Sequence, residues 1–122
     1  MPATKAVFLN DAPNQIASVY GGGRRARLEQ IVDLYPEIIG SREMARHAAA
    51  LAEAEVAFST WGMWALSAEQ LAMMPKLKAV FYAAGSVQNF ARPLLDRGIT
   101  VVSSWGANGV PVAEYTVAQI IL

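Results

Sequence analysis

The residues best placed for chemistry follow two predicted strands in the last third of the chain. Gly85 and Ser86 come directly after an apolar run, and consecutive main-chain N–H groups at such a turn can bind an anion. Asn108 follows the next apolar run, and its side-chain amide can donate to a carboxylate or carbonyl oxygen. Simpler roles stay open, because a glycine can serve only the turn and an asparagine can lead into a helix.

Three tryptophans, Trp61, Trp64 and Trp105, flank the same predicted strand ends and could wall a small pocket with apolar sides. Core or interface positions are the alternative for all three. The single histidine, His47, shares a predicted helix face with apolar residues, away from every strand end. Because a general base must reach its substrate, we expect His47 to be a semi-buried structural residue.

Other features that could bind or react have simpler interpretations. Gly21–Gly23 precedes two arginines, but it lies well beyond the first strand and lacks the spacing of a P-loop, so a helix-leading turn is expected. No His, Asp and Glu cluster has metal-ligand spacing, and no Gly-x-Ser-x-Gly nucleophile motif occurs. We therefore expect no catalytic, cofactor-binding or metal-binding residues.

The composition is that of a folded protein without a basic surface. Hydrophobic residues make up 54% of the 122 residues and charged residues 16%, with a formal net charge of zero and no cysteine. A neutral chain argues against a nucleic-acid partner. No signal peptide precedes the first strand, and no apolar run approaches the roughly 18 residues of a membrane span. These features predict a cytoplasmic protein that does not contact a membrane.

Short apolar runs alternate with helical patterns along the chain. The helical spacing of Leu28, Ile31, Val32 and Tyr35 predicts a helix that Pro36 ends. Expected strands are 5–9, 37–40, 56–59, 77–82 and 99–102. Expected helices are 28–35, 41–53, 67–75, 93–97 and a segment from Val110 to Leu122. Ser41 is the expected N-cap of the second, and a Ser67/Gln70 capping box with a Leu66/Leu71 staple marks the start of the third. The last segment follows a loop that holds Gly106 and Asn108.

This order predicts an α/β fold with a flavodoxin-like, doubly wound, five-stranded parallel sheet covered on both faces. Ligands bind such sheets at the carboxyl ends of the strands, which makes Asn10, Asp11 and residues 59–64 further candidates. A receiver domain is excluded because Ser59–Trp61 supplies no acceptor aspartate. A flavodoxin is excluded because Asp11 would repel a phosphate.

Three blocks of the last third resemble the D-isomer-specific 2-hydroxyacid dehydrogenases. They are residues 81–89, 97–102 and 107–116. In that family a flavodoxin-like substrate domain is followed by a Rossmann domain that binds NAD. The family turn usually reads Gly-x-Gly-x-Asp-Asn, whereas this chain has Ala-Gly-Ser-Val-Gln-Asn at 84–89.

The resemblance implies substrate-binding roles. Main-chain amides of Gly85, Ser86 and Val87 would hold the carboxylate of a small 2-hydroxy or 2-oxo acid. Asn108 matches an asparagine that touches substrate in the formate dehydrogenase branch, and the loop around Trp61 would face the same cleft.

The resemblance also implies a division of the chain. Residues 1–109 would form the substrate-binding domain, and residues 110–122 would begin the interdomain helix leading to an NAD-binding domain. No Gly-x-Gly-x-x-Gly turn occurs in the chain, so we expect a fragment, inactive alone and binding neither NAD nor NADP, of an NAD(P)-dependent oxidoreductase. A homodimer through the apolar end is also expected. The alternative is a stand-alone module that binds small carboxylates or serves assembly without catalysis.

Overall fold

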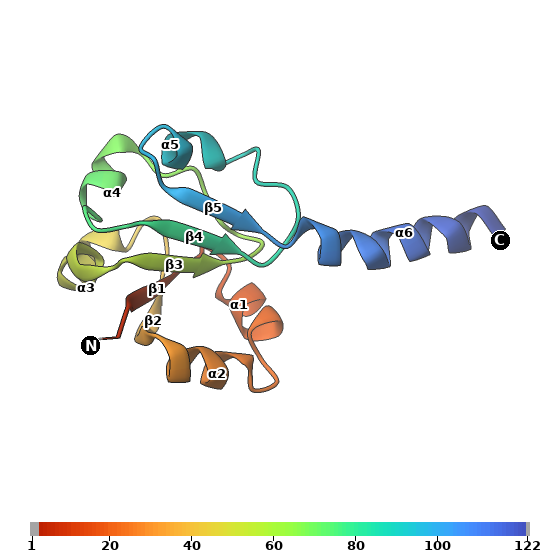
Figure 1. Cartoon of the computed structure of the whole chain (residues 1–122), viewed down its shortest axis with the longest axis horizontal. Coiled ribbons are helices and arrows are strands. Elements are labelled where there is room, and N and C mark those ends of the chain that lie inside the picture. Colours follow the sequence, from red (N-terminus) through yellow and green to blue (C-terminus); the bar gives the residue numbers. More distant parts are fainter. Residues whose placement is uncertain (1–2, 122) are drawn as a thin grey trace.

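A computed structural model describes residues 3–121; Leu122, the last residue of the expected terminal helix, lies outside them. Figure 1 shows one sheet with helices on both sides and a long helix that projects from the body. In chain order the elements are β1 (Lys5–Leu9), α1 (Pro13–Val19), α2 (Arg24–Ile31), β2 (Asp33–Ile39), the 3-10 helix η1 (Met44–His47), α3 (Ala48–Glu53), β3 (Val56–Ser59), α4 (Ala68–Ala72), β4 (Ala79–Tyr82), α5 (Ala91–Leu95), β5 (Thr100–Ser103) and α6 (Trp105–Ile121).

The sheet has the strand order β2-β1-β3-β4-β5, and every pairing is parallel. This confirms the predicted flavodoxin-like α/β architecture. Pairing from β1 to β5 is in register, so rows of residues cross the sheet and share a face. The two central rows are Val7–Ala57–Val80–Val101 and Phe8–Phe58–Phe81–Val102.

The main core lies between one face of the sheet and the helices α3, α4 and α5 (Figure 1). Each helix contributes a buried leucine, namely Leu51, Leu71 and Leu94, and the sheet contributes Val7 and Val80. Burying such side chains supplies most of the favourable free energy of folding, at about 25 cal/mol per Å² of apolar area. This face fixes the relative positions of the strand ends.

The opposite face is covered only in part. Over β1, the ring of Phe8 contacts Tyr20, which directly follows α1, at a centroid distance of 5.0 Å, and it lies 5.3 Å from the guanidinium carbon of Arg25 in α2. Farther along the same row, Phe81 is 37% exposed and Val102 is 42% exposed. The expectation that both faces are covered is therefore right for β1 and wrong for β4 and β5.

The start of α4 forms as its sequence predicts. The Ser67 hydroxyl accepts from the Gln70 N–H at 3.1 Å, and the Gln70 side chain accepts from the Ser67 N–H at 3.0 Å. Leu66 and Leu71, the two residues of the expected staple, are both buried. The capping box is therefore confirmed, and it closes two of the N–H groups that a helix start leaves without partners.

The predicted helix through Tyr35 is wrong. α2 already ends at Ile31, Val32 is extended, and Asp33–Ile39 forms strand β2, which includes Pro36. β2 is an edge strand, where a residue without an N–H is tolerated. The spacing that resembled a helix face joins the end of one element to the start of the next.

The helix expected from Ser41 also differs. The Ser41 N–H donates to Asp11 Oδ1 at 2.7 Å, so this residue belongs to a turn that contacts the β1 loop. Helical structure begins as η1 at Met44 and continues as α3 from Ala48. Pairing across the chain therefore prevails over the local N-cap signal.

The terminal helix α6 begins at Trp105 rather than at Val110. The Ser103 hydroxyl accepts from the Trp105 N–H at 3.1 Å, which places Gly106 and Asn108 inside the helix and not in a loop. α6 then projects from the body (Figure 1), and none of its described residues is buried. No helix within residues 3–121 combines the length and apolar character required to cross a membrane.

Candidate functional site

Buried polar side chains join the carboxyl ends of β1, β3 and β4. Asn10 is 1% exposed, and its Nδ2 donates to the Trp61 carbonyl at 2.9 Å and to Ser59 Oγ at 3.2 Å. Thr60 Oγ1 donates to the Ala83 carbonyl at 3.1 Å. These groups, which the sequence offered as ligand-binding candidates, instead position the loops that surround the strand ends.

The next strand end brings Gly85 and Asn108 together. β4 and β5 are neighbours, and Ser103 Oγ donates to the carbonyls of Ala84, at 3.1 Å, and of Gly85. A Cβ atom on Gly85 would lie 3.0 Å from Asn108 Nδ2, which is closer than ordinary contact allows. Gly85 is not among the described glycines with positive φ, so the approach of Asn108, and not the turn, requires a glycine.

Four N–H-bearing groups are available at this place. Within residues 3–121, the main-chain N–H groups of Gly85, Ser86 and Val87 donate to no protein acceptor, and the Asn108 amide makes no side-chain hydrogen bond. Asn108 is half-buried, whereas the other described residues of α6 are exposed. Such donors suit a small carboxylate, because hydrogen bonds to an ionised acceptor are about twice as strong as neutral ones.

The three tryptophans have different environments. Trp64 packs against the core, and its Nε1 donates to Gln70 Oε1 at 3.1 Å. Trp61 follows β3 and is 48% exposed, and Trp105 opens α6 and is 74% exposed. The core alternative therefore holds for Trp64, while Trp61 and Trp105 are exposed next to the carboxyl ends of β3 and β5.

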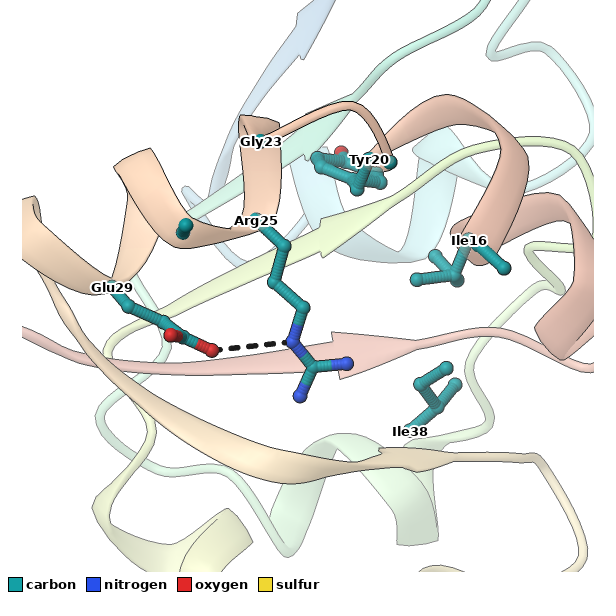
Figure 2. Close-up of a pocket in the computed structure, with 9 residues that line it drawn as sticks. Ile16, Tyr20, Gly23, Arg25, Glu29 and Ile38 are labelled. Atoms are coloured by element: carbon teal, nitrogen blue, oxygen red, sulfur yellow. Dashed lines mark hydrogen bonds and ion pairs between the residues drawn. The ribbon is translucent and has the colours of Figure 1, made fainter.

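The Gly21–Gly23 turn leads into α2, as expected. Gly23 is the residue before the helix and has a φ of 86°. Figure 2 shows the neighbouring cavity, of about 480 Å³, with Arg25 reaching in from α2 toward Ile16 and Ile38. The Arg25 guanidinium is already bound, since Nε lies 3.3 Å from Glu29 Oε1 and Nη2 donates to the Pro36 carbonyl at 2.6 Å. This arginine holds α2 on the sheet.

One histidine and two tyrosines of the body, His47, Tyr20 and Tyr82, have side chains that pack within the fold. His47 is buried with its Nδ1 2.8 Å from the Tyr35 hydroxyl, which confirms a structural histidine. Burial raises the pKa of Tyr20 to about 12 and also raises the pKa of Tyr82. None of the five predicted site residues has a side chain that titrates, so the site can orient an acid but supplies no proton.

The carboxyl end of β1 carries an acidic side chain where a phosphate-binding turn would lie. A phosphate after β1 would meet the Asp11 carboxylate, whose Oδ1 accepts from the Ser41 N–H at 2.7 Å. The chain also lacks the glycine-rich turn that lets a pyrophosphate approach the backbone. Among residues 3–121, no three His, Asp or Glu side chains gather as metal ligands would.

Comparison with known proteins places the fold. No protein-family model and no curated protein matches the chain. It is similar to the crystal structure of D-lactate dehydrogenase from Aquifex aeolicus, complexed with NAD and lactic acid, with 21% identity and a TM-score of 0.61 over 95% of this chain and 32% of that one. It is also similar to phosphoglycerate oxidoreductase from Vibrio cholerae O395, with 19% identity and a TM-score of 0.59 over 82% of this chain and 31% of that one.

Both solved structures are D-2-hydroxyacid dehydrogenases, so the resemblance seen in the sequence is confirmed at the level of the fold. The chain spans about a third of the length of each. Identities this low show a shared fold alone, and the roles of individual residues rest on the geometry of this chain.

Proposed function

We propose that this chain is the substrate-binding unit of an NAD(P)-dependent oxidoreductase of the D-2-hydroxyacid dehydrogenase family. Its ligand is a small 2-hydroxy or 2-oxo acid. The observation that carries the proposal is the close approach of Asn108 to Gly85 beside three main-chain N–H groups without a protein acceptor. The solved D-lactate dehydrogenase, which shares this fold, was crystallised with NAD and lactic acid.

The residues of this chain bind and orient the acid. The amides of Gly85, Ser86 and Val87 hold its carboxylate, and Asn108 donates to a carboxylate or 2-oxo oxygen. The exposed ring of Trp61 faces the same edge. The cofactor supplies the hydride when bound, and a further unit of the parent protein holds it, because residues 1–122 contain no dinucleotide turn.

Titration followed by ¹⁵N-resolved NMR tests the binding proposal. Adding D-lactate or glyoxylate should shift the backbone amides of residues 85–87 and the side-chain amide of Asn108, while lactamide at the same concentration should not. The amide analogue keeps the size of lactate and removes its charge. Shifts confined to other parts of the chain, or no shift at millimolar ligand, would reject this site.

A second function, a module that binds small carboxylates without catalysis, is favoured by one observation. All the proposed donors belong to this chain, so binding needs no second unit. The two functions differ in the gene, since a reading frame that continues into a glycine-rich βαβ unit supports the dehydrogenase. For the 122 residues alone we expect no oxidation of NADH with glyoxylate or hydroxypyruvate, and measured turnover would contradict the inactive-unit assignment.

A further inference from the structure

Ser103 ends β5 and contacts the turn that carries the candidate donors. Its hydroxyl donates to the carbonyls of Ala84, at 3.1 Å, and of Gly85, and it accepts from the Trp105 N–H at 3.1 Å. A serine hydroxyl has one hydrogen and two acceptor lone pairs, so this single group ties two carbonyls of the turn to the first N–H of α6. The two halves of the candidate site, the turn after β4 and the start of α6, therefore meet at one side chain.

The direction of each carbonyl in this turn also fixes the direction of the next N–H group. Within residues 3–121 every peptide bond is trans, and in a planar trans peptide the C=O and the following N–H point in opposite directions. The Ala84 and Gly85 carbonyls both point toward Ser103 Oγ. The N–H groups of Gly85 and Ser86 therefore both point away from it, and consecutive N–H groups that share a direction can bind one anion together.

The two carbonyls are not held equally. The Ala84 carbonyl has a second donor, the Ser104 N–H, at 3.1 Å. Among the described residues, only the Ser103 hydroxyl donates to the Gly85 carbonyl. Loss of this hydroxyl would therefore release the Gly85–Ser86 peptide and leave the Ala84–Gly85 peptide in place. Because Ser86 is exposed, the released carbonyl can rotate toward water, which satisfies it as the hydroxyl did.

We propose that Ser103 is a positioning residue of the acid site, which acts through the turn rather than on the ligand. The inference rests on the proposed function, in which the N–H groups of Gly85 and Ser86 hold the carboxylate. With the hydroxyl in place, the Ser86 N–H points toward the anion. Without it the Gly85–Ser86 peptide rotates, and the anion loses this donor. The same hydroxyl binds the Trp105 N–H, so it also fixes the start of α6, the helix that carries Asn108.

Residual dipolar couplings of the ¹⁵N-labelled chain without ligand report the direction of each N–H group and test this orientation. Ser103→Val and Ser103→Thr are the matched pair, because they differ only in a methyl group against the hydroxyl. In Ser103→Val the coupling of the Ser86 N–H should change while that of the Gly85 N–H stays, and in Ser103→Thr both should match the wild type. Ser104→Ala is the control, since Ser104 bonds this turn through its main-chain N–H. An unchanged Ser86 coupling in Ser103→Val would overturn the proposal.

Titration of the same variants with D-lactate separates this inference from the proposed function. Ser103→Val should raise the dissociation constant by roughly tenfold or more, because one hydrogen bond to a charged group is lost. Ser103→Thr and Ser104→Ala should stay within about threefold of the wild type. Equal affinity of the wild type and Ser103→Val would show that Ser103 has no positioning role. A wild type that binds no lactate, with a Ser86 coupling that still changes in Ser103→Val, would reject the proposed function and leave the orienting role of Ser103. Dispersed amide spectra establish that each variant is folded.

Discussion

The substitution Gly85→Ala isolates the contact on which the candidate site depends. The new Cβ would lie 3.0 Å from Asn108 Nδ2 and 3.7 Å from Cγ, so the amide must move by a few tenths of an ångström or more. If this removes one hydrogen bond to a charged ligand, the loss is about 1.5–3 kcal/mol, or roughly 10- to 150-fold in the dissociation constant for lactate or glyoxylate. Stability should change by less than about 1 kcal/mol, because Gly85 does not need positive φ.

Calorimetric titration and urea unfolding of the same samples measure both effects. Gly98→Ala is the matched control, since Gly98 has a φ of 74° and open space around its Cβ position. That variant should lose about 1 kcal/mol of stability and keep its affinity. In the background of Asn108→Ala, Gly85→Ala should have no further effect on binding. Unchanged affinity in Gly85→Ala, or an additive double variant, would refute the role of the contact.

The remaining predictions concern the body that positions this contact. Asn10→Ala should lower the free energy of unfolding by about 2–3 kcal/mol, because it removes a buried amide that joins the β1 and β3 loops; a loss under 0.5 kcal/mol in urea would contradict this. Ser67→Ala should lower the free energy of unfolding by about 1 kcal/mol through loss of the capping box. Ser86→Ala is the control, because it removes the same hydroxyl at a position that caps no helix, and it should cost less. The pKa of Tyr20 is raised by burial to about 12 from 10.0. Its neutral form is therefore favoured in the folded state, and stability should be intact below pH 10 and fall as the pH rises toward 12. Tyr20→Phe should flatten that fall, and equal pH profiles for the two chains would contradict it.

Local sequence signals predicted the elements whose stability is local. The Ser67/Gln70 capping box needs only residues within one helical turn, and it forms as expected. The short apolar runs predicted all five strands, because each strand buries side chains on at least one face. The prediction failed where long-range pairing decided the outcome. Pairing of Asp33–Leu34 and Ile38–Ile39 with β1 fixes both ends of an edge strand and carries Tyr35 and Pro36 along as a bulge, against a helical spacing that continued to Tyr35.

The candidate site was predictable in part for the same reason. Parallel strands end at one edge, so residues after neighbouring strands were expected to meet, and Gly85 does meet Asn108. The helical position of Asn108 was missed because Gly106, Gly109 and Pro111 all disfavour a helix interior. The Ser103 hydroxyl that accepts the Trp105 N–H was the available signal for an earlier start. The exposure of Phe81 and Val102 had no signal in the sequence, because it depends on what covers that face of the sheet.

Asn108 lies in the first turn of α6, so a movement of the far end of this helix also moves Asn108. Asn108 lies about 4.5 Å along the axis from Trp105, and the far end lies about 24 Å away at 1.5 Å per residue. If α6 pivots about Trp105, a 5 Å displacement of its far end would move the Asn108 backbone by about 1 Å, which is more than the few tenths of an ångström that a Cβ on Gly85 would require. A partner that binds the outer turns of α6 therefore changes the affinity of the chain for the acid. By thermodynamic linkage, the acid changes the affinity for that partner by the same factor. A dissociation constant for lactate that is equal with the outer turns of α6 free and restrained would show that the two events are independent.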